Sequence, residues 1–349
     1  MTTHTTRPGS EPMSVLDLAA RHRLSTMIEG YRASALVHVA AELGIATLLA
    51  ERPRTAAELA QETRTNPRTL GQVLRALCGL GVLAEDDGAL TLTPAGAFLD
   101  PRHPMSLHGQ AVYFGGPSYL SYSGLVESLR EGGIAFDHVF GMPYYSYLDR
   151  EPAMAEHYHR MIALPAGAAT VIGTLFDFTT ARQIVDVGGG NGSLLAEILT
   201  LAPQARGVLL ELPLTEPSAL ATLATAPGGD RCEFVAGDFR EHVPAGGDVY
   251  VLSRVLANWA DPMCERILGN CRDALRPGGR LLVFEMMMPD QVTEGMRVVD
   301  GDMNALAHLG GAVRTRAEFT ALLGSAGLKL DRVQQLPNSQ WTLLEASLA

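Results

Sequence analysis

The sequence lacks the long apolar stretch of a membrane protein, and it is poor in cysteine, lysine and aromatic residues. No apolar run approaches the ~20 residues that a membrane-spanning helix requires, so we expect no membrane partner. Residues 1–12 are polar and rich in threonine, which predicts a disordered N-terminal tail and not a signal peptide. We therefore expect a cytoplasmic protein.

The four cysteines and the acidic net charge argue against a metal site and a polyanionic partner. The cysteines Cys78, Cys232, Cys264 and Cys271 lack the paired spacing of metal ligands and have apolar neighbours, which predicts buried, reduced thiols. The net charge of -11 argues against a polyanionic partner such as nucleic acid. We attribute the single lysine, Lys329, to genomic base composition. What the chain does contain is 349 residues at 47% apolar content, enough for two domains of ~100–200 residues each.

A short apolar strand that ends in an acid and breaks into glycines is the most specific motif. It runs from Ile184 to Ser193 with the sequence IVDVGGGNGS. Glycines let a ligand approach the backbone, so a nucleotide-type cofactor is expected at the carboxyl end of the first strand of an open α/β sheet. A dinucleotide site would need a third glycine where Ser193 stands, and Asp186 would repel a diphosphate. That carboxylate suits an amino group, which S-adenosylmethionine (SAM) carries on its methionine half.

Further strand ends are expected to complete this site, because the carboxyl ends of parallel strands lie at one edge of a sheet. Glu211 ends a strand over 207–213 and would hold the ribose hydroxyls, while Asp238 and Phe239 end a strand over 232–239 and would meet the adenine. Two more strands are expected over 248–256 and 280–285. The expected cofactor-binding residues are Asp186, Gly188, Gly190, Glu211, Leu212, Asp238, Phe239 and Ser253. An α/β domain with empty strand ends is the alternative.

These motifs resemble those of the SAM-dependent, caffeate-type O-methyltransferases, and within them the bacterial enzymes that tailor aromatic polyketides. The resemblance extends over nearly the whole chain, including AAELGI at 40–45, TAAELA at 55–60 and GGAVRTR at 310–316. It implies an α/β fold: a Rossmann-like SAM-binding methyltransferase domain with an N-terminal, mainly helical winged-helix domain that forms a homodimer. We expect the dimerisation domain over 13–105, a helical linker and substrate-pocket region over 106–175 and the SAM-binding domain over 176–349.

Local signals in the N-terminal part also indicate a winged helix. Thr55 and Glu58 form a capping box, and Asn66-Pro67 begins the next helix. Apolar segments at 82–83 and 90–92, joined across 86–88, would make the wing. A DNA-binding regulator is the competing interpretation, but acids slightly outnumber bases in this region, which disfavours phosphate contacts. The apolar helix expected over 33–49 would pack against a second copy of the chain.

A cluster of aromatic residues between the two expected domains indicates a flat, aromatic small-molecule substrate. Its members are Tyr113, Phe114, Tyr119, Tyr122, Phe136, Phe140, Tyr144, Tyr145 and Tyr147. Ordinary core packing is an equal alternative for this group. The resemblance implies substrate contacts for Met161, at the family's pocket methionine, and for Asp302 and Asn304 in the family's pocket-lining stretch. Tyr144 is the fourth expected substrate-binding residue.

The catalytic position departs from the family pattern. Where the common form has Leu-His-Asp-Trp, with the histidine accepting the substrate's proton, this chain has the residues LANW at 256–259. The family's glutamate that positions this histidine is Val313 here, whereas a second supporting glutamate is retained as Glu285. Our candidate catalytic residues are Asn258, Glu285 and His308. His138, His157 and His159 are further candidates for a replacement base.

The sequence thus predicts a SAM-dependent O-methyltransferase that acts on an aromatic or polyketide-like natural-product intermediate without a histidine base. Holding the reactants in line can supply effective molarities of ~10⁵–10⁸ M, whereas a general base contributes ~10²–10⁴ in rate. The alternative is a SAM-binding enzyme of the same fold that catalyses decarboxylation, hydroxylation or a pericyclic step. An anthracycline-tailoring subgroup of the family lacks the histidine and includes both kinds of enzyme.

Overall fold

The computed structural model describes residues 15–162, 167–336 and 339–349, with the backbone alone for residues 15 and 159–162. The tail expected over 1–12 lies outside these residues. The chain divides into two compact units. Unit 1 comprises Met1–Tyr119 with Pro152–Met161, and unit 2 comprises Leu120–Glu151 with Ile162–Ala349. The region 106–175, expected as one linker, is shared between the two units.

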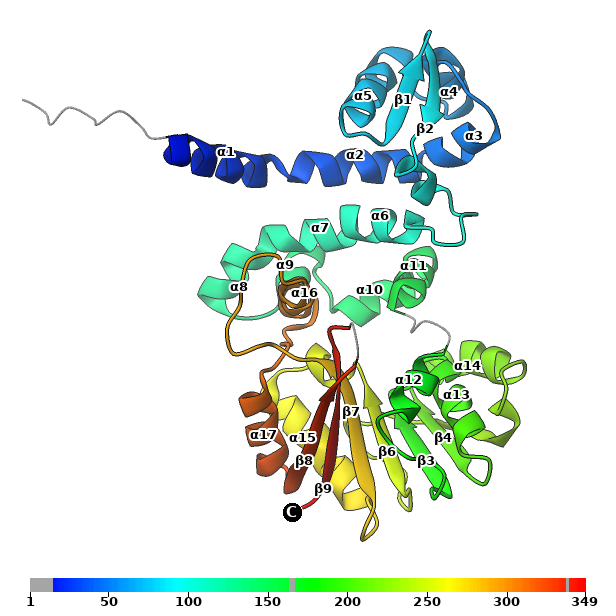
Figure 1. Cartoon of the computed structure of the whole chain (residues 1–349), viewed down its shortest axis with the longest axis vertical. Helices are drawn as coiled ribbons and strands as arrows, with labels where there is room; N and C mark the ends of the chain where they lie inside the picture. The colour runs from blue at the N-terminus through cyan, green and yellow to red at the C-terminus, as the bar shows by residue number, and fades with distance from the viewer. Residues whose placement is uncertain (1–14, 163–166, 337–338) are drawn as a thin grey trace, which may run out of the picture. The chain divides into compact units, whose positions relative to one another are not determined.

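Unit 1 is a helical domain with a two-stranded wing (Figure 1). Its elements are α1 (Val15–Glu29), α2 (Tyr31–Glu42), α3 (Ile45–Glu51), α4 (Ala56–Glu62), α5 (Pro67–Gly79), β1 (Leu83–Asp86), β2 (Ala89–Leu92), η1 (Gly96–Leu99), α6 (His108–Gly115) and α11 (Pro152–Ile162). The strands β1 and β2 pair antiparallel across a tight turn, in which Asp87 and Gly88 have φ of 46° and 75°. Left-handed residues at both positions are what a two-residue hairpin turn requires.

The helix starts in unit 1 follow the local signals of the sequence. The Thr55 hydroxyl accepts the N–H of Glu58 at 3.2 Å, and the Glu58 carboxylate accepts the N–H of Thr55 at 2.7 Å. Asn66 accepts the N–H of Arg68 at 3.0 Å at the start of α5. Each cap satisfies a backbone donor that has no partner within its helix, so the predicted capping box and Asn cap are confirmed.

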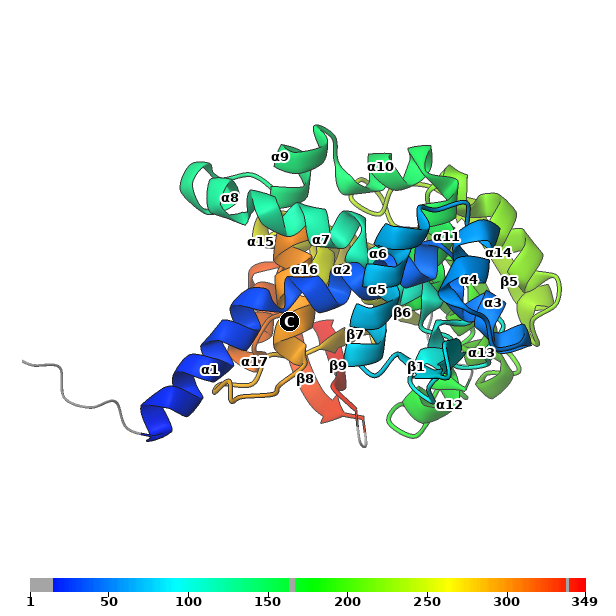
Figure 2. The same cartoon turned by 90° about the horizontal axis from the view of Figure 1, so that it is seen from above.

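The single apolar helix expected over 33–49 is wrong. Gly44 takes a left-handed φ of 62° and separates α2 from α3. The buried members of this stretch belong to the core of unit 1 itself: Ala40, Ala41, Ile45, Ala46 and Leu49. Exposed apolar side chains lie on α1 instead, where Leu16, Leu24, Met27 and Ile28 are each more than half exposed. Figure 2 shows α1 projecting from the rest of unit 1.

No single helix in the described part of the chain is long and apolar enough to cross a bilayer. One pair of helical segments reaches the length and composition of a membrane span only when the two are taken together. It consists of Leu16–Glu42 and Ile45–Glu51, which are bent by 59° at their junction.

Unit 2 is built on a seven-stranded sheet with the order β5-β4-β3-β6-β7-β9-β8. Its strands are β3 (Gln183–Val187), β4 (Arg206–Glu211), β5 (Cys232–Ala236), β6 (Val249–Ser253), β7 (Arg280–Met286), β8 (Leu328–Gln335) and β9 (Trp341–Leu348). Strands β3 to β7 are parallel, and β9 runs antiparallel to both β7 and β8. The expected fourth strand ends at Ser253 and not at Leu256, because the chain turns at Arg254 and enters the short helix η5 (Leu256–Asn258).

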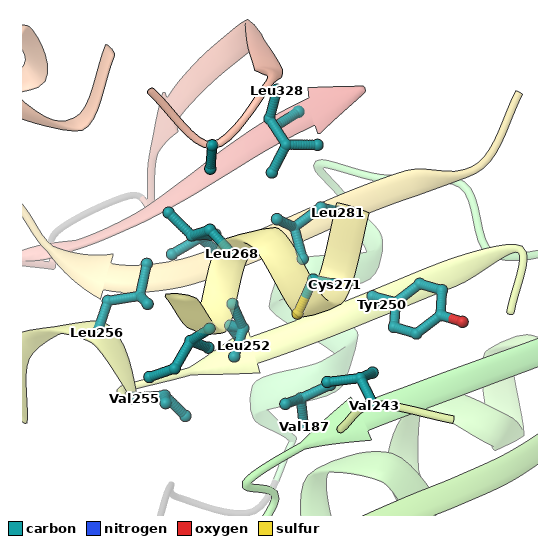
Figure 3. Close-up of a cluster of buried hydrophobic side chains, with 14 of the residues drawn as sticks. Val187, Val243, Tyr250, Leu252, Val255, Leu256, Leu268, Cys271, Leu281 and Leu328 are labelled. Atoms are coloured by element: carbon teal, nitrogen blue, oxygen red, sulfur yellow. The ribbon is translucent and has the colours of Figure 1, made fainter. Parts of the chain in front are cut away.

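Helices cover both faces of this sheet. The helices and turns of unit 2 are η2 (Tyr122–Gly124), α8 (Leu125–Glu131), α9 (Ala135–Phe140), α10 (Tyr144–Arg150), α12 (Ala168–Gly173), α13 (Ser193–Leu201), η3 (Pro213–Thr215), α14 (Glu216–Leu223), η4 (Gly229–Arg231), α15 (Asp261–Ala274), α16 (Val298–Leu309) and α17 (Arg316–Ser325), while α7 (Pro117–Ser121) crosses the boundary with unit 1. One face packs on α15 and α17. Figure 3 shows part of this cluster, with Leu268 and Cys271 of α15 against the sheet. The other face packs on α12, α13 and α14. The strand order reverses between β3 and β6, and ligands of open α/β sheets bind at such a point.

Candidate cofactor and acceptor site

Asp186 is the penultimate residue of β3, directly before the glycine loop. Its side chain has no exposed surface, and neither carboxylate oxygen has a hydrogen-bond partner within the described residues. Burial and, to a smaller extent, the neighbouring Glu211 raise the pKa of Asp186 to about 7, against the opposing effect of the positive charge of Arg254. A buried carboxyl group without a partner fits a cationic ligand.

Two glycines of this loop stand where a side chain would not fit. Gly188 has φ of 71°, and a Cβ there would lie 3.0 Å from Cε1 of Phe239. A Cβ on Gly189 would overlap the Asp186 carboxylate and lie 2.6 Å from Cδ1 of Leu209. Gly188 and Gly190 are expected from the sequence, whereas Gly189 is not, because its closeness to Asp186 arises from the fold of the loop.

Glu211 ties the glycine loop to the end of β4. One of its carboxylate oxygens accepts the N–H of Gly190 at 3.1 Å, and the other accepts the N–H of Leu212 at 2.8 Å. Burial raises the pKa of Glu211, although these two N–H groups partly counteract it. The expected ribose-binding acid is therefore fixed in orientation by two backbone donors.

Asp238 follows β5 and is held by Arg240, which is not among the residues expected from the sequence. The Arg240 guanidinium donates to both Asp238 oxygens, at 2.9 Å and 2.6 Å for the shortest contact to each. These hydrogen bonds lower the pKa of Asp238. Arg240 also lies 5.1 Å from the ring centre of Trp259, and the same ring meets Phe239 edge to face at 6.3 Å. Two expected adenine contacts, Asp238 and Phe239, thus share one cluster with Trp259.

Ser253 and Arg254 end the neighbouring strand β6. The Ser253 hydroxyl is buried and has no hydrogen-bond partner within the described residues. Arg254 has φ of 58°, in the left-handed region that residues with a Cβ rarely adopt. This turn leads directly into η5, the segment that contains Ala257.

The segment at Ala257 is held from two sides. Glu285, at the end of β7 and only 1% exposed, accepts the Ala257 N–H at 3.3 Å. Burial raises the pKa of Glu285 to about 7. Arg314 donates to the carbonyls of Leu256 and Trp259 at 3.0 and 2.8 Å. The expected catalytic residue Glu285 therefore binds the backbone of the loop where the family has a histidine side chain.

The other candidate residues on this side form polar pairs within unit 2. Asn258 Nδ2 donates to the hydroxyl of Tyr145 and to the carbonyl of Arg254, both at 3.3 Å. Asn304 accepts the hydroxyl proton of Tyr122 at 2.9 Å. The carboxylate of Asp302 accepts the N–H of Val313 at 2.8 Å. Asp302 and Asn304 lie on α16, which contacts the η5 helix that contains Asn258. Figure 1 shows α16 and α10 at one end of the sheet.

His308 is packed among aromatic rings. Its ring stacks on Tyr144 with centres 5.5 Å apart and meets Phe136 and Tyr122 edge to face, both at 6.3 Å. The residue is 5% exposed. This arrangement favours a packing role over that of a mobile base.

The remaining aromatic and histidine candidates are dispersed. Tyr113 packs on Phe114 and Tyr158 in unit 1, whereas Phe136, Phe140, Tyr144 and Tyr147 contact one another in unit 2. His138 bonds to the Gly132 carbonyl at 2.9 Å, and His157 lies beside His108 in unit 1. The side chains of Met161 and His159 lie outside the described residues. Among the described residues, no group of three or more His, Cys, Asp or Glu could hold a metal ion.

Two family patterns account for most of the chain. The O-methyltransferase domain matches residues 122–329, and the O-methyltransferase dimerisation domain matches residues 25–99. The chain belongs to the O-methyltransferase family. The expected family, the winged-helix and Rossmann-like fold and the SAM cofactor are therefore confirmed, and the DNA-binding regulator is not supported.

Individual relatives span nearly the same length. The chain is 36% identical to phenazine O-methyltransferase PhzM of Lysobacter antibioticus over 336 residues, which cover 95% of both chains. It is 35% identical to aclacinomycin 10-hydroxylase RdmB of Streptomyces purpurascens over 303 residues, covering 84% and 80%. Among solved structures, mitomycin 7-O-methyltransferase MmcR gives a TM-score of 0.88 at 32% identity, covering 96% of this chain and 99% of that one. The O-methyltransferase NcsB1, solved with SAM and 2-hydroxy-5-methyl naphthoic acid, gives 0.81 at 28% identity, covering 91% and 96%.

Proposed function

We propose that this methyltransferase transfers the methyl group of SAM to an oxygen of an aromatic natural-product intermediate. The observation that carries the proposal is Asp186, a fully buried carboxyl group without a hydrogen-bond partner in the described structure, at the end of β3. Membership of the O-methyltransferase family supports it, as do relatives named as a phenazine O-methyltransferase and a mitomycin biosynthesis 6-O-methyltransferase. Bound SAM would supply an electrophilic methyl group on a sulfonium.

The residues for the cofactor follow the strand ends. Asp186 would bind the ammonium of the methionine half, and Glu211 would bind the ribose hydroxyls while it keeps Gly190 and Leu212 in place. Gly188 lets the backbone approach the cofactor beside Phe239. Asp238 and Phe239 would meet the adenine, and the buried Ser253 hydroxyl would face the methionine half. On the acceptor side, we propose that Tyr144, Asp302 and Asn304 of unit 2 line the substrate site. The pocket role that the resemblance implies for Met161 stays a prediction, since its side chain lies outside the described residues.

Methyl transfer here would proceed without a histidine base. The methyl side chain of Ala257 cannot accept a proton, and the nearby Glu285 is occupied by the backbone of the same loop. Asn258 would orient the acceptor together with Tyr145, to which it is hydrogen-bonded. A missing general base costs a factor of ~10²–10⁴ in rate, whereas holding the two reactants in line can supply an effective molarity of ~10⁵–10⁸ M. An acceptor that ionises readily can therefore still react.

The alternative of a non-methylating enzyme is not favoured, because relatives such as PhzM are named as O-methyltransferases. Its support is the presence of Ala257 together with a relative named as a hydroxylase, RdmB. In that case the same site would bind SAM but would not transfer its methyl group. Mass spectrometry of both product and cofactor separates the two functions. Methyl transfer raises the mass of the acceptor and converts SAM to S-adenosylhomocysteine, whereas the alternative leaves SAM intact.

We also propose that α1 forms the contact between two copies of the chain. The chain carries a dimerisation domain, and exposed apolar side chains on α1 have no cover within unit 1. Cytoplasmic location remains part of the proposal, supported by free thiols at Cys78, Cys232, Cys264 and Cys271.

A further inference from the structure

We propose that this site also methylates the nitrogen of an aromatic amine, an activity that goes beyond transfer to oxygen. The inference rests on the proposed function, because it uses the same SAM as methyl donor. Asn258 carries it, the residue that directly follows the alanine at the family's histidine position. None of the residues 256–258 has a side chain that can remove a proton, whereas the amide of Asn258 has an oxygen that can accept a hydrogen bond.

Oxygen and nitrogen acceptors differ in when their proton leaves. A hydroxyl oxygen becomes a good nucleophile only as its proton is removed, which is the task of the family's histidine. A neutral aromatic amine already has a lone pair on nitrogen. During transfer a C–N bond forms, the C–S bond breaks with its electron pair going to sulfur, and the positive charge passes from sulfur to nitrogen. The arylammonium then loses its N–H proton to water. The missing side chain at residue 257 therefore hinders transfer to oxygen more than transfer to nitrogen.

Hydrogen bonds fix which way the Asn258 amide points. Its Nδ2 donates to the Arg254 carbonyl and to the Tyr145 hydroxyl, both at 3.3 Å. A carbonyl oxygen can only accept, so the nitrogen of the amide must lie on that side. Both N–H groups are thus used, while Oδ1 has no hydrogen-bond partner among the described residues. An amine N–H can donate to this oxygen, whereas an ionised oxygen would be repelled by it, so the amide favours an amine acceptor.

The backbone around Asn258 is held in place, which fixes Oδ1 in turn. The Asn258 N–H donates to the Val255 carbonyl at 3.1 Å, and a Cβ on Gly311 would lie 2.7 Å from the Asn258 carbonyl carbon. Arg314 donates to the next carbonyl, that of Trp259, at 2.8 Å. A hydrogen-bonding group that is fixed in advance needs little reorganisation when it binds its partner, so Oδ1 can orient an amine and leave the nitrogen lone pair for the methyl group.

The charges near this loop suit a product that carries a positive charge. Helix α16, which contacts η5, carries the carboxylates of Asp300 and Asp302. One Asp302 oxygen accepts a backbone N–H at 2.8 Å, and the other makes no hydrogen bond within the described part of the chain. The guanidinium of Arg240, which interacts electrostatically with Tyr145, is neutralised by hydrogen bonds to both oxygens of Asp238. Carboxylates stabilise a nearby cation, so the charge left on nitrogen after transfer is favoured here.

The test uses two aromatic probes that differ only in the acceptor atom: naphthol and the naphthylamine with the same substitution. Each is incubated with the enzyme and saturating SAM, and mass spectrometry measures the methylated product and S-adenosylhomocysteine. We expect N-methylation of naphthylamine at a rate that changes by less than about twofold between about pH 7 and 9, because the amine is neutral throughout. Methylation of naphthol should be slower at neutral pH and rise by up to about tenfold per pH unit below the pKa of naphthol.

The outcomes separate this inference from the proposed function. If naphthol is methylated and naphthylamine is not, only this inference fails. If neither probe is methylated although S-adenosylhomocysteine binds, the proposed transfer to an aromatic acceptor fails with it. A naphthylamine rate that rises with pH as the naphthol rate does would also overturn the inference, because a proton would then have to leave before transfer.

Two variants test the role of Asn258. Asn258→Leu removes the acceptor oxygen at similar volume, so we expect the ratio of the naphthylamine rate to the naphthol rate to fall by about fivefold, the effect of one lost hydrogen bond. Asn304→Leu is the matched control, because the Asn304 oxygen is already bound to the Tyr122 hydroxyl at 2.9 Å, and it should leave this ratio unchanged. Equal losses for both probes in Asn258→Leu would overturn the assignment of Asn258. The wild-type comparison decides the activity itself, whether or not Asn258→Leu folds.

Discussion

The backbone N–H of Ala257 donates a hydrogen bond to the carboxyl group of Glu285 over 3.3 Å. In the family pattern, a glutamate at this position supports the catalytic histidine side chain. Here Glu285 instead binds the backbone of Ala257, the residue that replaces this histidine. Arg314 fixes the same loop from the carbonyls of Leu256 and Trp259. The loop therefore keeps its backbone support although residue 257 has no side chain that could accept a proton.

The buried Glu285 makes stability depend on pH. Its pKa is raised from 4.5 to about 7 in the folded protein, so the stability that this shift contributes is present below pH 4.5 and is lost as the pH rises through 7. We expect the free energy of unfolding of Glu285→Gln to fall less with rising pH than that of the wild type. Between pH 4.5 and 8, the free energy of unfolding of the variant should rise relative to wild type by about 3 kcal/mol at most.

Denaturant unfolding at several pH values measures this difference. Glu265→Gln is the control, since Glu265 is exposed on α15 and should leave the wild-type pH dependence in place. A parallel pH dependence of wild type and Glu285→Gln would show that Glu285 ionises freely in the folded protein.

Asp186 should make cofactor binding weaken as the pH falls, whereas the stability that depends on Glu285 is lost as the pH rises. An ammonium ligand needs the ionised carboxylate, and the pKa of Asp186 is raised to about 7, so binding should weaken as the pH falls below 7. We expect up to about a tenfold loss of S-adenosylhomocysteine affinity per pH unit, measured by calorimetry. Asp186→Asn should bind weakly and show a flatter profile. Strong, pH-independent binding by this variant would remove Asp186 from the cofactor site.

A glycine on another segment fixes the position of η5. A Cβ on Gly311 would overlap the Ala257 carbonyl oxygen and lie 2.7 Å from the carbonyl carbon of Asn258. We expect Gly311→Ala to displace this loop, to destabilise the protein by about 1–3 kcal/mol and to lower activity. Gly269→Ala is the control, because nothing lies within 4 Å of a Cβ at this position in α15, and it should be neutral or stabilising. Thermal unfolding and turnover of both variants check the prediction.

The sequence revealed features that depend on neighbouring residues in the chain. Helix caps, the wing turn and the acids at strand ends are local features of the sequence. The candidate cofactor acids could be grouped because parallel strand ends meet at one edge of a sheet. The partners of the Ala257 loop were not found, because Gly311 and Arg314 reach it from more than fifty residues away. Strands β8 and β9 were also missed. Polar residues such as Lys329, Asp331 and Arg332 interrupt β8, and its pairing with β9 contains an irregularity.

The homodimer should depend on α1. Met27 and Ile28 are 62% and 67% exposed, and a second copy would bury them. Light scattering should give twice the chain mass of 37.3 kDa for the wild type and a single chain mass after Met27→Glu with Ile28→Glu. Leu214→Glu in unit 2, at a side chain 68% exposed, should leave the dimer intact. If the variant with both glutamates on α1 still has twice the chain mass, the contact between the two copies lies elsewhere.

The last prediction concerns the missing base. If the acceptor ionises by itself, the rate should follow the pKa of the substrate, so restoring a histidine should add little. We expect Ala257→His to gain at most about tenfold or to lose activity through crowding, because Gly311 packs directly against this segment. His308→Ala should lower stability, since it opens a cavity beside Tyr144 and Phe136, but should keep the shape of the pH–rate profile. Rates against pH for the wild type and both variants provide the measurement. A gain of about a hundredfold from Ala257→His would mean that the absent base limits this enzyme, and collapse of activity in a folded His308→Ala protein would mean that the base has moved to α16.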